Sequence, residues 1–193
     1  MADGIEHHTT GGITRRATLA GAVAALGLAA AGTPTSLRAA APFTFASIDG
    51  GTLALGDWAG RPVLVVNTAS LCAFTPQYEE LQTLWERYRE RGLVVLAVPS
   101  NDFRQELGSE EEVREFCEVT FGLDLPMTEI TRVRGPSAHP FYRWLAAEHG
   151  FRPRWNFNKV LIGPDGMPVR SWGSGASPLS ASVVGEIEAL LDP

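Results

Sequence analysis

One stretch of this 193-residue chain decides its fold: Val63-Leu-Val-Val-Asn-Thr-Ala-Ser-Leu-Cys72-Ala-Phe-Thr-Pro76. Its opening apolar run, which ends at Asn67, is typical of a strand that is buried on both faces. Thr75 can cap a following helix, and Pro76 suits the first turn of that helix. The stretch therefore predicts a buried strand, a short loop that carries a cysteine, and a helix.

The position of Cys72 indicates a redox nucleophile. A cysteine between the end of a strand and the start of a helix lies near the positive helix end and near unpaired N–H groups, which favour the thiolate. The thiolate is the form that attacks electrophiles. Thr75 occupies the place where a C-x-x-C motif has its second thiol. The loop therefore favours peroxide chemistry over dithiol exchange.

The elements outside this stretch complete an α/β pattern. Residues 93–99 form a second continuous apolar run, as a parallel sheet covered on both faces requires. Ser109-Glu-Glu-Glu112 is a capping box that starts a helix ending near Gly122. The remaining elements are predicted as a hairpin over 43–55, helices over 76–91 and 139–148, a hairpin over 159–172, and a C-terminal helix through Leu191. This order predicts a thioredoxin-like fold with a central mixed β-sheet flanked by helices.

Composition excludes several classes of function. The formal net charge is −6 and the basic residues form no stripe, which argues against nucleic acid and anionic membrane surfaces as partners. Two cysteines are too few for a disulfide-stapled scaffold. The four histidines show no metal-ligand spacing. We therefore expect neither a metal nor another cofactor.

The N-terminal residues 1–41 resemble a twin-arginine export signal. Arg15 and Arg16 precede a weakly apolar run, Ala20 to Gly32, which is shorter than the roughly 20 residues of a membrane-spanning helix. The alternative is an alanine-rich tail in which the arginine pair is accidental. We expect a signal over 1–41, a single domain over 42–193, a periplasmic or otherwise exported location, and no stable membrane insertion after processing.

Three motifs, in this order, resemble those of the glutathione peroxidases. The resemblance extends over about residues 43–191. The motifs are Val66-Asn-Thr-Ala-Ser-Leu-Cys-Ala-Phe-Thr-Pro-Gln-Tyr78, Pro99-Ser-Asn-Asp-Phe-Arg-Gln-Glu-Leu-Gly108 and Trp155-Asn-Phe-Asn-Lys159. In that family a cysteine or selenocysteine reduces hydroperoxides with the help of a glutamine, a tryptophan and an asparagine.

The resemblance implies that Cys72, Gln105, Trp155 and Asn156 are the catalytic residues. The cysteine would attack the hydroperoxide and become a sulfenic acid, which is the first oxidised state of a thiol. Two side-chain amides and an indole N–H can stabilise the thiolate by hydrogen bonds without a tight ion pair that would lower its nucleophilicity.

Cys117 has two interpretations that the sequence leaves open. At helical spacing it shares a stripe with Val113 and Phe116, as a buried core thiol would. Its surroundings also look like the segment with the resolving cysteine in thioredoxin-linked family members. That likeness implies a disulfide with Cys72 and a thioredoxin-like reductant. The alternatives are a one-cysteine peroxidase that uses glutathione and a peroxide sensor that relays its oxidation to a partner.

The chain departs from the family pattern in several places, among them Ser100 where many members have a cysteine and Leu107 where a proline is usual. Ala73 follows the nucleophile where a glycine is usual, and the loop before Gln105 is one residue shorter. The segment from Gly150 to Arg154 lacks the insertion of tetrameric members. The resemblance therefore implies a monomer with an open site, like those that accept lipid or organic hydroperoxides. The sequence around Cys72 has no cluster of arginine or lysine that would indicate a glutathione pocket.

Overall fold

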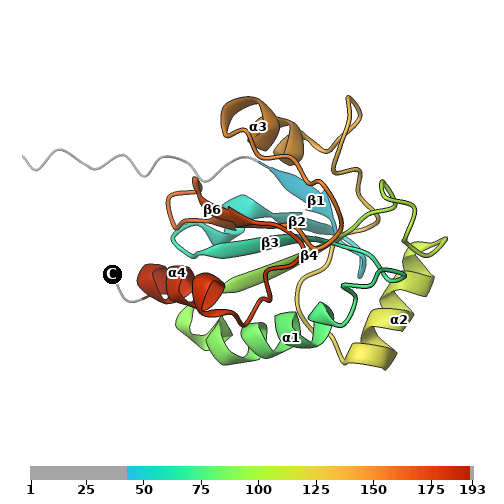
Figure 1. The fold of residues 1–193 in the computed structure, drawn as a ribbon, viewed down its shortest axis with the longest axis horizontal. Helices are drawn as coiled ribbons and strands as arrows, with labels where there is room; N and C mark the ends of the chain where they lie inside the picture. Colours follow the sequence, from blue (N-terminus) through green and yellow to red (C-terminus); the bar gives the residue numbers. More distant parts are fainter. Residues whose placement is uncertain (1–42, 192–193) are drawn as a thin grey trace, which may run out of the picture. The chain divides into compact units, whose positions relative to one another are not determined.

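The computed structural model describes residues 43–191, so the predicted export signal lies outside the described residues. The main sheet has four strands in the order β4-β3-β5-β6 (Figure 1). They are β3 (Val63–Thr68), β4 (Val94–Pro99), β5 (Lys159–Ile162) and β6 (Pro168–Trp172). β3 pairs in parallel with β4 and antiparallel with β5, and β5 pairs antiparallel with β6. The predicted mixed sheet is confirmed.

The remaining elements also follow the predicted order. A separate two-stranded sheet is the N-terminal hairpin, formed by β1 (Thr44–Ala46) and β2 (Thr52–Ala54). The α-helices are α1 (Gln77–Tyr88), α2 (Glu110–Phe121), α3 (Pro140–Glu148) and α4 (Ala181–Leu191). Two short 3-10 helices are η1 (Leu55–Trp58) and η2 (Arg89–Arg91). The helix predicted over 76–91 is therefore shorter than expected, because its last turn tightens into η2.

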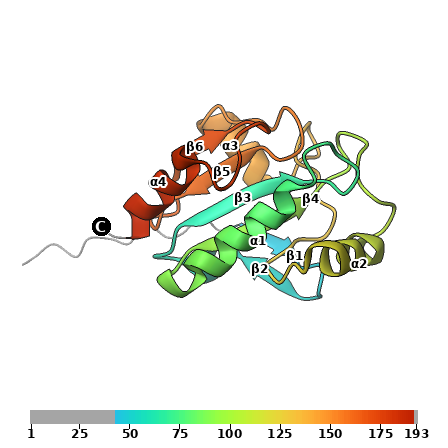
Figure 2. The same cartoon turned by 60° about the horizontal axis from the view of Figure 1, so that its bottom comes forward.

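Helices cover both faces of the main sheet (Figures 1 and 2). Leu64 and Val66 of β3 pack in one apolar cluster with residues of α1, α2 and α4. Val63 and Val65, which alternate with them, pack in a second cluster with α3 and the N-terminal hairpin. The strands β3 and β4 are buried along their full length. This double burial explains their continuous apolar sequences and confirms the thioredoxin-like fold.

Two local predictions need correction. Thr75 does not cap α1, whose N-cap is Pro76. The Thr75 hydroxyl instead accepts the Cys72 N–H at 3.0 Å and donates to the Ala69 carbonyl at 2.9 Å. Ser109 caps α2 as predicted, but the Glu112 carboxylate reaches the Gly108 N–H and not that of Ser109. In both cases the polar side chain satisfies a loop amide that would otherwise lack a partner.

The topology brings three loops to one edge of the main sheet. Since β3 and β4 are parallel, their carboxyl ends meet there, and the antiparallel β5 begins at the same edge. Ligands of open α/β sheets bind outside the carboxyl ends of the strands.

Within residues 43–191, no helix is long and apolar enough to span a membrane.

Candidate active site

Hydrogen bonds join the three sequence motifs at the sheet edge. The Leu71 N–H, next to Cys72, donates to the Gln105 carbonyl at 2.8 Å. Asn67, near the carboxyl end of β3, donates from Nδ2 to the Trp155 carbonyl at 3.0 Å. Each motif therefore contacts another by a hydrogen bond, and the motifs form one site although 88 positions separate Asn67 from Trp155.

Cys72 lies in a tight turn just before α1. The residue is 8% exposed, and its Sγ accepts a hydrogen bond from the Phe74 N–H at 3.5 Å. The Thr75 N–H donates in return to the Cys72 carbonyl at 3.0 Å. Because α1 begins only at Gln77, the N–H group that faces the sulfur belongs to this turn and not to the helix itself. The turn thus provides the unpaired donor that the sequence predicted.

Gln105 and Asn156 form an amide pair. The Asn156 Nδ2 donates to the Gln105 Oε1 at 2.9 Å, and Asn156 is fully buried whereas Gln105 is half-buried. Since its Oε1 is occupied, Gln105 presents its Nε2 donors to other partners. The shortened loop still allows this contact, and Arg104 within it adopts a left-handed conformation with φ 58°.

Trp155 lies at the surface of the site and is 42% exposed. Its ring packs on Phe103 with centroids 5.3 Å apart. The Arg134 guanidinium also lies over the Phe103 ring, 5.2 Å from the ring centroid. Trp155 therefore forms an accessible aromatic wall of the site. Phe103 continues this wall toward Arg134.

The predicted donors do not hydrogen-bond directly to the sulfur in this state. Among residues 43–191, Cys72 Sγ accepts only from Phe74, and no hydrogen bond links it to Gln105, Trp155 or Asn156. Their action on the thiolate therefore stays a prediction. Phe157, next to Asn156, has φ 59°, which is an unfavourable conformation for a side chain with a Cβ and costs about 1–3 kcal/mol. Such outliers concentrate at functional sites.

Glu106 is a buried residue of the site to which the sequence analysis gave no role. Its Oε1 accepts the Ser70 N–H and the Leu107 N–H, each at 3.0 Å. Burial raises the pKa of Glu106, and the hydrogen bonds from these two residues oppose the rise. Glu106 thus ties the loop before Cys72 to the loop of Gln105. A glutamate in a polar loop carries no local signal of burial, which is why its motif alone did not reveal it.

Lys159 supports the Trp155–Asn158 segment from inside the fold. Its fully buried ammonium donates to Gln77 Oε1 and to the Phe157 carbonyl, each at 2.7 Å. Desolvation lowers its pKa to about 8, against the opposing effect of Glu80. As the only lysine in a chain that otherwise uses arginine, it carried a signal that the sequence analysis did not use.

Ser174 connects this support to the catalytic candidates. Its hydroxyl donates to the Asn156 carbonyl at 2.6 Å, and its own carbonyl accepts from Gln77 Nε2 at 2.7 Å. Asn158 Nδ2 donates to the same hydroxyl at 2.8 Å. Asn156 is therefore held from both its side chain and its backbone.

Cys117 is buried in α2 and, like Cys72, is a free thiol. Burial raises its pKa to about 12, and the neighbouring Tyr78 hydroxyl offsets the rise only in part. Cys72 and Cys117 belong to the same apolar cluster, on the α1 face of the sheet. Cys117 also lines a pocket of about 330 Å³ together with Arg114 and Met127. The structure thus describes the reduced form, in which Cys117 is a protonated thiol.

Comparisons with known proteins agree on the family. A family model described as glutathione peroxidase matches residues 41–146. A hydroperoxy fatty acid reductase from Synechocystis sp. is 41% identical over 160 residues, which cover 77% of this chain and 94% of that protein. The crystal structure of Trgpx in its apo form is 30% identical with a TM-score of 0.61, and the match covers 81% of this chain and 96% of Trgpx.

The fold extends beyond that family. A thioredoxin family thiol:disulfide interchange protein from Chlorobium tepidum superposes with a TM-score of 0.59 at 14% identity. The superposition covers 80% of this chain and 96% of that protein. At this identity the likeness concerns the fold alone.

Proposed function

Because the chain belongs to the glutathione peroxidase family, and is thus an enzyme of the peroxidase class, we propose that it reduces hydroperoxides with the Cys72 thiolate. One observation carries the proposal. Gln105, whose side chain accepts the Asn156 amide, also accepts through its backbone carbonyl the N–H of Leu71, the residue before this cysteine. This contact supports a role for the neutral amide donors at a nucleophile that already accepts the Phe74 N–H.

The first chemical step is a displacement at oxygen. The Cys72 sulfur attacks the distal oxygen of the hydroperoxide, an S–O bond forms, and the O–O bond breaks with both electrons on the leaving oxygen. That oxygen takes a proton from water and leaves as an alcohol, or as water when the substrate is hydrogen peroxide. The Gln105 and Asn156 amides and the Trp155 indole N–H favour the reaction by stabilising negative charge on the sulfur and on the leaving oxygen.

We assign Cys117 as the resolving residue. Its thiol sulfur attacks the sulfenic acid sulfur of Cys72, water leaves, and a disulfide forms. The two Cα atoms of a disulfide lie about 4.4–6.8 Å apart, so α2 must unwind locally to bring its buried thiol forward. The 330 Å³ pocket beside Cys117 supports this, because a helix that packs against open space loses few contacts when it opens. A thioredoxin-like protein then reduces the disulfide.

The experiment is to oxidise the purified domain with one equivalent of peroxide and to map its cysteines by mass spectrometry. We expect a Cys72–Cys117 disulfide in the wild type. The Cys117→Ser variant should instead contain sulfenic or sulfinic Cys72, and the Cys72→Ser variant should form no disulfide. Oxidised Cys72 beside a free Cys117 in the wild type would contradict resolution and favour the one-cysteine cycle with glutathione. An enzyme that does not consume peroxide continuously with either reductant would instead be a sensor.

Export and oligomeric state complete the proposal. We propose that residues 1–41 direct the folded domain, residues 42–193, out of the cytosol as a monomer. The arginine pair of the signal supports the route. Replacing Arg15 and Arg16 by lysine should leave the precursor inside the cell, and light scattering of the processed domain should give the mass of one chain. Normal export of the lysine variant would contradict the twin-arginine route.

A further inference from the structure

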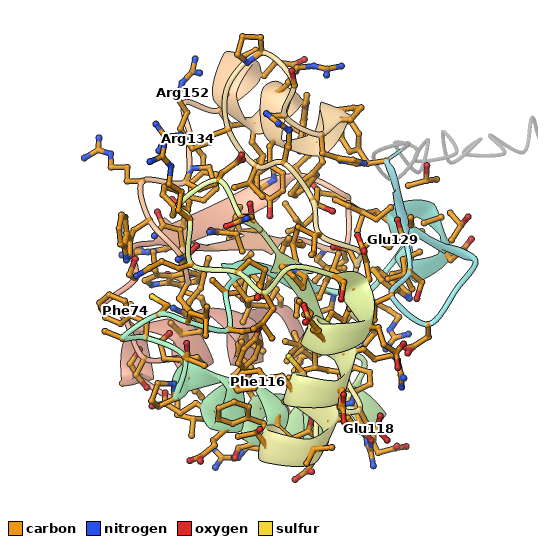
Figure 3. All side chains as sticks on the ribbon, turned by 90° about the vertical axis from the view of Figure 1, so that its right-hand side faces the viewer. Phe74, Phe116, Glu118, Glu129, Arg134 and Arg152 are labelled. Carbon is orange, nitrogen blue, oxygen red and sulfur yellow. The ribbon has the colours of Figure 1, made fainter. Side chains whose placement is uncertain are left out.

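A pocket of about 690 Å³ lies beside α3 and is lined in part by the segment that leads into Trp155. Four of its lining residues are arginines, and none is acidic: Arg134, Arg143, Arg152 and Arg154. Arg134 and Arg152 lie close together beside α3 (Figure 3). The sequence does not reveal the cluster, because its members are spread over some 20 residues and meet only where the loops fold against α3.

Among residues 43–191, none of the four arginine side chains forms an ion pair. Arg143 donates to the Ala138 carbonyl at 2.8 Å, and Arg134 lies on the Phe103 ring. A cluster of this kind in a chain of net charge −6 concentrates attraction for an anion at one place.

The pocket also has apolar lining. Val133, Ala138 and Tyr142 are buried lining residues, and Ala146 of α3 adds to them. The pocket thus offers cationic groups and a hydrocarbon surface together, which fits an amphipathic anion.

Two contacts connect the pocket to the proposed catalytic residues. Arg154 directly precedes Trp155 in the chain. Arg134 lies on Phe103, and Phe103 packs on the Trp155 ring. A ligand whose charged end lies among the arginines can therefore extend its apolar part along the Trp155 wall toward the site of Cys72.

We propose that this pocket binds the carboxylate of a free fatty-acid hydroperoxide and so makes such acids the preferred substrates. The inference rests on the proposed peroxidase function. Arginine suits the task, because its planar fork binds a carboxylate through two parallel hydrogen bonds. An esterified lipid lacks that carboxylate and should be used less well.

The test compares kcat/KM for a C18 fatty-acid hydroperoxide and for its methyl ester, both below their micellar concentrations. We expect the wild type to prefer the acid by about tenfold, the effect of one good charge-assisted hydrogen bond at an exposed site. In the double variant Arg152→Gln/Arg154→Gln the acid-to-ester ratio should fall toward one. The ratio is internal to each protein, so a general loss of activity does not alter it.

Arg87→Gln is the matched control. Arg87 is an exposed arginine of α1, on the opposite face of the sheet from α3. Its replacement removes one positive charge, as each of the two replacements in the double variant does. The control should retain the preference for the acid. Added NaCl should lower that preference in the wild type, because salt screens exposed charges. This measurement keeps the proposal testable if the double variant does not fold.

Two further measurements distinguish a failure of the proposed pocket from a failure of the proposed peroxidase function. Calorimetry should show that laurate binds to the reduced enzyme and that methyl laurate does not. Equal kcat/KM values for acid and ester, a preference that survives in the double variant, or binding of inorganic phosphate in place of laurate would overturn the proposal. Cumene hydroperoxide, which is small and uncharged, tests the function itself: a wild type that does not reduce it would refute the peroxidase assignment and not the pocket.

Discussion

Removing the Glu106 carboxylate tests whether the two catalytic loops depend on each other. Its Oε1 accepts the N–H groups of Ser70 and Leu107, and Ser70 is buried. In Glu106→Ala both donors lose their acceptor. Leaving a buried donor unsatisfied costs about 1–3 kcal/mol, and the half-buried donor adds to this. We expect a net loss of about 3 kcal/mol in the free energy of unfolding at pH 5.

The pH dependence of that loss follows from the raised pKa of Glu106. Because the folded state favours the protonated form, the stabilisation by Glu106 is complete below its ordinary pKa of 4.5 and declines as the pH rises through the folded-state pKa. Glu106→Ala should therefore lose less stability at pH 8 than at pH 5. Glu106→Gln is the control, since it keeps an acceptor oxygen but does not titrate.

The assay is thermal unfolding of the reduced domain at both pH values. For a domain of this size, about 3 kcal/mol corresponds to a drop in Tm of about 6–12 °C, and Glu106→Gln should lose clearly less. The rate at which peroxide oxidises Cys72 should fall in the alanine variant and be largely kept in the glutamine variant. A drop of less than about 2 °C in Glu106→Ala would refute the argument, because it would mean that the two hydrogen bonds contribute almost no net stability.

Three further predictions concern the buried groups around the site. Lys159→Met should become more stable relative to the wild type as the pH falls from 10.5 to 8, by about 3 kcal/mol in urea unfolding, because the unfolded lysine takes up a proton in this range while the buried native Lys159 resists charging; a constant difference would contradict this. Cys117, with a pKa raised to about 12, should resist iodoacetamide at neutral pH in the native reduced protein and react in urea, and rapid native labelling would argue against its burial. Asn156→Ala releases Gln105 Oε1 and should slow oxidation of Cys72 about tenfold in stopped-flow mixing, whereas an unchanged rate would remove the amide pair from the mechanism.

Local patterns in the sequence determined the elements and their order. The apolar runs at 63–67 and 93–99 identified the central parallel strands, since only a strand covered on both faces is apolar throughout. Ser109 and Gly122 marked both ends of α2 through capping chemistry that acts within a few residues. The family and the candidate residues also followed from linear motifs, because each motif is contiguous.

Tertiary structure alone decided which of the remaining side chains contribute to the site. Thr75 suits a helix cap by its position, yet its hydroxyl binds the loop at Ala69. Nothing local in the sequence shows that Glu106 and Lys159 are buried in the fold. The four arginines of the α3 pocket become a cluster only through loop packing. The physical reason is that periodicity and capping depend on near neighbours, whereas burial and the meeting of like charges depend on contacts between distant parts of the chain.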